Sequence, residues 1–313
     1  MHQRYQRYPQ GLVKSAQTTQ SAPAQAPPNG AQSATGALPN LIIIGAQKCG
    51  TSGLHYHLGL HPEVSMSRPK ELNYFIEERN WPRGEDWYRR HFDPAAKVRG
   101  EASPNYTAFP QHVGVPERMA SVVPDAKLIY LLRDPLQRIA AHWVHNYAKR
   151  REKGTLAETL VHPNTSYVTR SKYAMQLERF LEHYPMDRIL VFQQSELRHQ
   201  RRETLRRIFE FIGVDPEFEH PRFEQERHQT SGKTRATRLA VRLEQLGRSR
   251  RGRLFPSNFW LVLDDRLPLR RTIARPDVRA ALPAETLEEL RADGNRLREL
   301  TGRDFSNWKI WGP

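Results

Sequence analysis

Three stretches of consecutive apolar residues divide a chain that is otherwise mostly polar. Residues 41–44 (LIII) stop at Gly45, residues 126–132 (AKLIYLL) stop at Arg133, and residues 187–192 (DRILVF) form the third stretch. Strands buried on both faces of a parallel sheet have such runs without alternation. The pattern predicts a doubly wound α/β fold, with a mostly parallel sheet and flanking helices.

Helical spacing of apolar residues follows these stretches. Leu54 and Leu58 are one turn apart, a helix is predicted after Pro135, and an amphipathic helix follows Tyr173. The last segment, residues 282–308, is predicted to begin with a further amphipathic helix. Short strands are expected near residues 61–66 and 98–106, the second ending in a proline turn.

The two ends of this pattern suggest the domain limits. Residues 1–40 are rich in Gln, Ala, Pro, Ser and Thr, and have too few apolar side chains to offset the entropy of ordering. We therefore expect a disordered tail at 1–40 and one folded domain at 41–313. Residues 239–278 are basic and match no motif, and they are interpreted as a substrate-binding or interface region.

Composition is typical of a soluble protein. Of 313 residues 38% are hydrophobic, and the mean hydropathy is −0.75. No run approaches the roughly 18 apolar residues of a membrane span, and no signal-peptide pattern begins the chain. Cys49 is the single cysteine, which excludes an intramolecular disulfide and favours a reducing, cytoplasmic location. No Cys/His cluster has metal-ligand spacing, so no metal is expected.

The net charge of +15 and the pI near 10.2 indicate an anionic partner. Nucleotides, acidic glycans, nucleic acid and anionic membranes all fit that charge. The basic runs at 149–153 and 248–253 have no interleaved aromatic residues for base stacking. A solvated basic face explains them equally well, and no specific nucleic-acid partner is predicted.

The stretch from Leu41 to Leu60 reads as strand, glycine-bearing loop and helix. This arrangement presents backbone N–H groups and a helix N-terminus to a phosphate. Lys48 precedes the Gly50-Thr51 pair, so the loop differs from the GxxxxGK[ST] loop of nucleotide triphosphatases. Cys49 within it is interpreted as a small space-filling residue rather than a nucleophile.

The K-x-G-T order resembles the 5′-phosphosulfate loop of sulfotransferases that use 3′-phosphoadenosine 5′-phosphosulfate (PAPS). Further segments are similar to the carbohydrate-type members of that family, the heparan-sulfate sulfotransferases and their bacterial relatives. Their order and spacing carry the resemblance from about residue 41 to 308. The segments are KELNYF at 70–75, GEASPNY at 100–106, RDPLQR at 133–138, SKY at 171–173 and a terminal LxxLxGRDFxxW.

The resemblance implies roles for single residues. Glu71 is the expected base for the acceptor proton, and Lys48 the cation that stabilises the leaving group. The donor PAPS would be held by loop and crevice residues, with Arg133 on its 3′-phosphate and Tyr173 on adenine. The expected donor-binding residues are Lys48, Cys49, Gly50, Thr51, Ser52, Arg133, Tyr173 and position 141, with Lys233 and Arg235 on a loop that closes over the nucleotide.

Two positions depart from the family pattern. Ala102 stands where many members carry a lysine, and Ala141 stands where a serine would help to hold the 3′-phosphate. A non-catalytic binder of nucleotide or polyanion would explain both positions as decay of the active site. Another nucleotide-dependent transferase, such as a kinase, is the second alternative.

Several of these residues also fit ordinary structural roles. Lys70 and Glu71 fit a solvated ion pair, Arg138 a helix-surface or ion-pair residue, and Tyr173 an aromatic that packs a helix start. The expected acceptor is an acidic or neutral glycan, while neither its identity nor the oligomeric state follows from the sequence.

Overall fold

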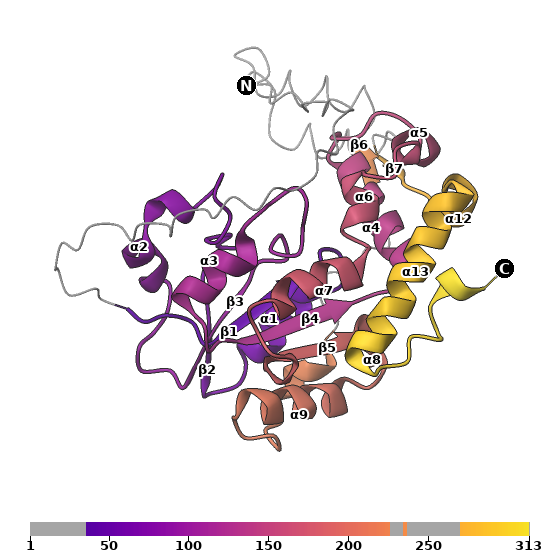
Figure 1. The fold of residues 1–313 in the computed structure, drawn as a ribbon. Helices are drawn as coiled ribbons and strands as arrows, with labels where there is room; N and C mark the ends of the chain where they lie inside the picture. The colour runs from indigo at the N-terminus through magenta and orange to yellow at the C-terminus, as the bar shows by residue number, and fades with distance from the viewer. Residues whose placement is uncertain (1–35, 226–233, 237–269, 313) are drawn as a thin grey trace, which may run out of the picture. The chain divides into compact units, whose positions relative to one another are not determined.

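A five-stranded, all-parallel sheet forms the centre of the computed structural model (Figure 1). The structure describes residues 36–225, 234–236 and 270–312. The strand order is β2-β3-β1-β4-β5, and the predicted α/β fold class is confirmed. The strands are β1 (Leu41–Gly45), β2 (Val64–Met66), β3 (Val98–Ala102), β4 (Lys127–Leu132) and β5 (Ile189–Gln193).

Burial explains why β1 is apolar throughout. Every residue of β1 is buried, and Leu41 pairs with Gly100 of β3 on one side and Lys127 of β4 on the other. The chain leaves β1 toward β2 and β3, then crosses back to β4. The carboxyl ends of β1 and β4 therefore meet where the strand order reverses, which is the usual ligand site of such sheets.

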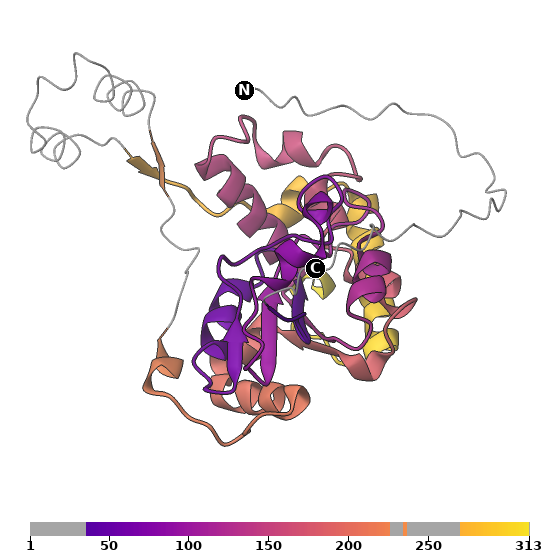
Figure 2. The same cartoon turned by 90° about the vertical axis from the view of Figure 1, so that its left-hand side faces the viewer.

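Helices cover the sheet on both sides. In Figure 1, α2 and α3 lie to the left of the strands and α12 and α13 to the right, while Figure 2 gives the view turned by 90°. Helix α13 lies alongside α7, and α12 approaches α4 and α5. The α-helices are α1 (Thr51–Leu58), α2 (Glu85–Arg89), α3 (Val115–Val122), α4 (Pro135–Ala148), α5 (Leu156–Leu160), α6 (Ser166–Thr169), α7 (Tyr173–Leu181), α8 (Gln194–His199), α9 (Arg201–Ile212), α12 (Val278–Ala281) and α13 (Ala284–Thr301).

Local sequence signals set several helix ends. Asp134 caps α4 by accepting the amide of Gln137, and Pro135 occupies the first helical position, where no N–H is needed. Helix α9 ends at Gly213, whose φ of 81° is left-handed and suits glycine. Short 3₁₀ turns complete the chain at η1 (Trp81–Arg83), η2 (Met186–Arg188), η3 (Pro221–Glu224) and η5 (Lys309–Trp311).

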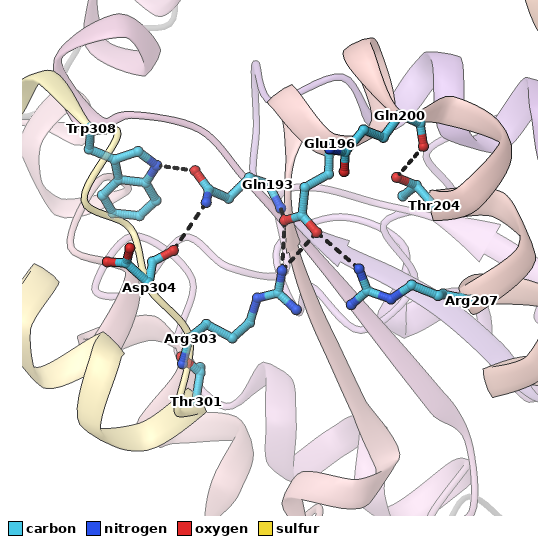
Figure 3. A network of polar contacts seen from close by, with 9 residues as sticks. All are labelled: Gln193, Glu196, Gln200, Thr204, Arg207, Thr301, Arg303, Asp304 and Trp308. Atoms are coloured by element: carbon cyan, nitrogen blue, oxygen red, sulfur yellow. Dashed lines mark hydrogen bonds and ion pairs between the residues drawn. The ribbon is translucent and has the colours of Figure 1, made fainter.

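The C-terminal segment is bound to the carboxyl end of β5 and to the start of α8 (Figure 3). Arg303 donates to both oxygens of Glu196 at 2.7 Å, and the Trp308 indole donates to Gln193 Oε1 at 2.7 Å. The Lys309 amide donates to Asp134, the cap of α4. A two-pronged guanidinium contact is directional, so this network fixes where the last residues lie against the sheet.

The first described residues are also tied to the sheet. The Asn40 side chain accepts the Arg99 amide at 2.8 Å and donates to the Lys97 carbonyl at 2.9 Å, while Leu38 packs against the core. Ordered contacts thus begin a few residues before Leu41. The predicted disorder of the tail falls mostly on residues 1–35, which lie outside the described residues.

Two further strands, β6 (Thr234–Ala236) and β7 (Arg270–Thr272), pair antiparallel, and β6 approaches α4. Most of the predicted 239–278 region lies outside the described residues. Among the residues that the structure describes, no helix is both long and apolar enough to cross a membrane.

Candidate active site

The glycine-bearing loop between β1 and α1 closes against the end of β4. The Ala46 amide donates to the Leu131 carbonyl at 2.8 Å, and the Cys49 amide donates to the Ala46 carbonyl at 3.1 Å. Lys48 and Gly50 have left-handed φ values of 73° and 103°. No side chain caps α1, and its first turn carries no acidic residue. A helix N-terminus of this kind favours an anion.

The side chains of Lys48 and Cys49 have different neighbours. Lys48 Nζ lies 3.4 Å from His145 Nδ1 on α4. Cys49 is fully buried, and its Sγ lies 3.7 Å from the Tyr173 hydroxyl. Burial raises the pKa of the Cys49 thiol to about 11, although Arg138 opposes the shift. The neutral thiol fits the predicted space-filling role, since a thiolate is the reactive form.

Tyr173 contacts both the phosphate loop and the segment after β4. Its hydroxyl donates to the Arg133 carbonyl at 2.7 Å, and its ring meets Trp308 edge-on at 5.6 Å. The ring is fully buried. In this structure Tyr173 packs the start of α7, which is the structural role considered from the sequence. The ring would have to become exposed before it could contact adenine.

Arg133 follows β4, and the structure brings a second arginine beside it. Arg133 donates to the Gln137 side chain at 3.0 Å, and Arg275 donates to the Gln137 carbonyl at 3.2 Å. Burial, and after it the charge of Arg275, lowers the pKa of Arg133. Sequence reasoning missed Arg275, which lies in no motif and is 142 positions from Arg133. Two cations therefore flank the first turn of α4.

Arg138 lies beneath the phosphate loop and is fully buried. The helix-surface alternative is therefore wrong. Its guanidinium forms no ion pair with a described carboxylate and is held by neutral groups. These are Ser171 Oγ at 2.6 Å, the Tyr167 carbonyl at 2.7 Å, His142 Nδ1 at 3.2 Å and the Gln47 carbonyl at 3.4 Å. Burial lowers the pKa of Arg138, but a guanidinium remains charged in proteins.

Four further residues near this edge carry no negative charge that would oppose its cations. Burial, followed by the charge of Arg138, lowers the pKa of His142 well below its ordinary value, so His142 is neutral at pH 7. Ala141 is buried on α4, one turn after Gln137. Thr51 is buried at the start of α1, and Ser52 is partly exposed beside it.

Glu71 lies on a loop between β2 and η1. Its side chain is 44% exposed and pairs with Lys70 Nζ at 2.8 Å. The solvated ion pair considered from the sequence is thus present, and it leaves the carboxylate open to an acceptor. Glu71 and Asn73 have left-handed φ values of 67° and 49°, which are uncommon outside glycine.

The Glu71 loop lies at the same edge of the sheet as the phosphate loop. The Ser103 amide donates to the Ile43 carbonyl of β1 at 3.2 Å, and Ser103 Oγ accepts the Asn73 amide at 2.9 Å. On α1, His55 Nε2 lies 3.2 Å from the Ser67 carbonyl. The structure therefore places the phosphate loop, which is expected to bind the PAPS donor, and the Glu71 loop, which is expected to face the acceptor, at the same edge of the sheet.

Glu101 is a buried carboxyl to which none of the sequence motifs assigns a role. It accepts hydroxyl hydrogens from Tyr88 at 2.6 Å, Tyr106 at 2.7 Å and Ser103 at 2.9 Å. Burial raises the pKa of Glu101, and the three hydroxyl donors oppose that shift. Ala102, the departure from the lysine pattern, is fully buried in β3.

The closing-loop residues are only partly covered by the structure. Lys233 lies outside the described residues. Arg235 is the middle residue of β6 and pairs in register with Arg271 of β7. Their expected contacts with the donor stay predictions.

Comparisons with known proteins agree with this arrangement. The model of the family described as "Sulfotransferase domain" matches residues 38–252. The chain is 29% identical over 202 residues to human bifunctional heparan sulfate N-deacetylase/N-sulfotransferase 2, covering 57% of the chain and 22% of that protein. It is also 29% identical over 197 residues to bifunctional heparan sulfate N-deacetylase/N-sulfotransferase 1 of Caenorhabditis elegans. That match covers 58% of this chain and 22% of the relative.

A solved structure shares the fold. The crystal structure of a sulfotransferase from Alicyclobacillus acidocaldarius aligns with a TM-score of 0.62 at 25% identity, covering 87% of this chain and 99% of that one. The chain spans about a fifth of the length of the curated relatives that it matches. On the family match over residues 38–252 of 313, the chain belongs to the sulfotransferase domain family.

Proposed function

We propose that this protein transfers a sulfuryl group from PAPS to a hydroxyl or amine of a glycan or glycoconjugate. The observation that carries the proposal is a set of cations at the carboxyl ends of β1 and β4. Lys48 lies beside the uncapped start of α1, and Arg133 and Arg138 form no ion pair with any described carboxylate. Such a site favours a dianionic or more highly charged ligand.

The proposed chemistry is an in-line displacement at sulfur. The acceptor oxygen or nitrogen forms a bond to sulfur, the bond from sulfur to the bridging phosphate oxygen breaks, and the acceptor proton passes to Glu71. The product PAP leaves with the bonding electrons on its 5′-phosphate. Lys48 would stabilise the charge that develops on the bridging oxygen, as cations do in phosphoryl transfer.

The donor would be held between two phosphate sites. Amides of residues 49–52 and the Thr51 hydroxyl would bind the 5′ side, and Arg133 the 3′-phosphate. Arg275 supplies a second cation next to Arg133, on the side where Ala141 lacks the expected hydroxyl. Lys233 and Arg235 remain proposed contacts from the closing loop.

The glycan acceptor is supported by two observations. The curated relatives are named as heparan sulfate N-sulfotransferases, and the net charge of +15 suits an acidic polymer. Incubation with ³⁵S-labelled PAPS and a panel of acidic and neutral glycans tests this. We expect label on a glycan, identified by product mass, and no labelled glycan in any reaction would contradict the proposal.

Thermal-shift titration separates the donor from other nucleotides. A ligand that binds only the folded state raises the melting temperature by mass action, by an amount set by its concentration relative to Kd. We expect stabilisation by PAP and none by ATP with Mg²⁺. Stabilisation by PAP without sulfuryl transfer would indicate a non-catalytic binder, and stabilisation by ATP alone would indicate another transferase.

A further inference from the structure

The loop that carries Glu71 is held by hydroxyl groups rather than by regular secondary structure. The Asn73 amide donates to Ser103 Oγ at 2.9 Å, and the Tyr74 amide donates to the Tyr106 hydroxyl at 2.9 Å. Both amides lie two to three residues after the proposed base. Two residues of this short loop have left-handed backbones, a conformation that persists where surrounding contacts fix it.

Each of these hydroxyls can accept an amide only if its own hydrogen points elsewhere. Ser103 Oγ donates to Glu101 Oε2 at 2.9 Å, and the Tyr106 hydroxyl donates to Glu101 Oε1 at 2.7 Å. A hydroxyl has one hydrogen and two lone pairs. Because both hydrogens are committed to Glu101, the lone pairs of both hydroxyls are available to the loop. Glu101 itself is fully buried.

We infer that Glu101 is a positioning residue for the proposed base, acting through Ser103 and Tyr106 on the backbone after Glu71. This inference rests on the proposed function of Glu71. Glu101 touches neither the acceptor nor the donor in this arrangement. It fixes the direction of two hydroxyl groups, and these hold the loop in the conformation that places the Glu71 carboxylate.

A side-chain contact closes the loop from the other direction. Asn73 Nδ2 donates to the Glu71 carbonyl at 2.7 Å, and Asn105 Nδ2 donates to Asn73 Oδ1 at 2.9 Å. Ser103, Asn105 and Tyr106 all belong to the turn that follows β3. The segment after β3 thus holds the Glu71 loop at three places.

Tyr88 provides a matched control within the same network. Its hydroxyl donates to Glu101 Oε1 at 2.6 Å, as that of Tyr106 does, and its ring is also fully buried. No amide of the Glu71 loop donates to it; it stacks on the Tyr74 ring at 4.2 Å, a contact that phenylalanine keeps. Tyr88→Phe and Tyr106→Phe each remove one hydrogen bond to Glu101, but only Tyr106→Phe removes a contact to the loop backbone.

Hydrogen exchange and kinetics on the full chain test the inference. In Tyr106→Phe the Tyr74 amide should exchange about 10-fold faster or more, because its acceptor is lost. We expect kcat to fall about 10- to 100-fold, since small misplacements of a catalytic group are costly. The KM for PAPS and the Kd for PAP should stay within about twofold. Ser103→Ala should speed exchange at Asn73 in the same way, and it serves if Tyr106→Phe does not fold.

Tyr88→Phe should leave loop exchange and kcat near wild type. Its loss of thermal stability should be smaller than that of Tyr106→Phe, which also leaves the buried Tyr74 amide without its acceptor. Equal exchange and equal kcat in the two variants would overturn the inference, as would faster exchange in Tyr106→Phe without loss of kcat. Failure of the proposed role of Glu71 is distinguishable, because it shows as near wild-type turnover in Glu71→Gln. Failure of the proposed sulfuryl transfer shows as absence of turnover in the wild type, and the exchange difference remains in both cases.

Discussion

The two sides of the candidate site bury charge of opposite sign and use it differently. Arg138, beneath the phosphate loop, is buried among neutral acceptors, and Glu101, behind the Glu71 loop, is buried among neutral donors. The cation has no described counter-ion, so its field extends to the loop above it. The anion is saturated by three hydroxyl groups that face the protein. One side therefore attracts a ligand, while the other fixes a geometry.

Loss of Lys48 should give the largest loss of activity among these variants, because Lys48 is proposed both to bind the donor and to stabilise the leaving group. Lys48→Ala should lower kcat about 10²–10³-fold, the usual loss for one stabilising donor, and should weaken PAP binding as well. Steady-state kinetics and calorimetry measure both. Lys97→Ala removes the same charge from an exposed site near the amino end of β3. Equal losses of kcat and of PAP affinity in the two variants would show that Lys48 acts only through the net charge of the protein.

The pH dependence of stability should report on His55, which lies between the two sides. Burial, opposed by the contact with the Ser67 carbonyl, lowers the pKa of His55 from 6.5 to about 4. The unfolded chain binds a proton near pH 6.5 and the folded one only near 4. Stability is therefore fully present above about pH 6.5 and is lost as pH falls toward 4, by about 3 kcal/mol for this group.

Denaturant unfolding at pH 7 and pH 4.5 checks this expectation. His55→Gln should flatten the loss of stability between the two pH values by about 2–3 kcal/mol, with the exposed His183→Gln as control. An unchanged slope in His55→Gln would show that His55 is protonated in the folded state at pH 4.5.

The 3′-phosphate site predicts an intermediate effect. Arg133→Ala should weaken PAP binding about 10- to 100-fold, since hydrogen bonds to charged groups contribute roughly 1.5–3 kcal/mol. Arg275→Ala should weaken it less, because Arg275 is exposed. Adenosine 5′-phosphosulfate, which lacks the 3′-phosphate, should bind both variants as it binds the wild type. Weakened binding of that control would place Arg133 elsewhere on the donor.

Ala141 predicts the smallest effect and has a close control. A serine hydroxyl there should tighten PAP binding about fivefold, near 1 kcal/mol, because water offsets part of the present loss. Ala140→Ser introduces the same hydroxyl at an equally buried neighbour that points to a different side of α4. Calorimetry that shows no difference between Ala141→Ser and Ala140→Ser would mean that position 141 does not face the 3′-phosphate.

The sheet and the phosphate loop were predictable because they depend on local patterns. Residues 41–44 and 128–132 are apolar throughout because both of their faces are buried. Arg133 directly follows β4, so it lies at the edge of the sheet where the parallel strands end. Sequence reasoning therefore predicts that Arg133 lies near the phosphate loop. In the structure, the Tyr173 hydroxyl contacts both the Arg133 carbonyl and Cys49 Sγ.

Contacts between distant segments were not predictable in the same way. Arg275 reaches α4 from a stretch that matches no motif, and Arg138 is buried because Ser171, 33 positions away, accepts its Nε hydrogen. The sequence alone does not show that Glu101 is buried, because its burial depends on hydroxyl partners that come from other segments. The proposed role of Glu101 depends on Ser103 and Tyr106, which no spacing rule connects to Glu71.

The division between a side that binds and a side that positions is tested most directly by Glu71→Gln, with PAP calorimetry and single-turnover transfer of ³⁵S measured on the same preparation. We predict a PAP Kd within about twofold of wild type and a transfer rate about 10²–10⁴-fold lower, because the variant keeps the cations and loses only the base. Near wild-type transfer, or a loss of PAP affinity as large as the loss in rate, would contradict that division.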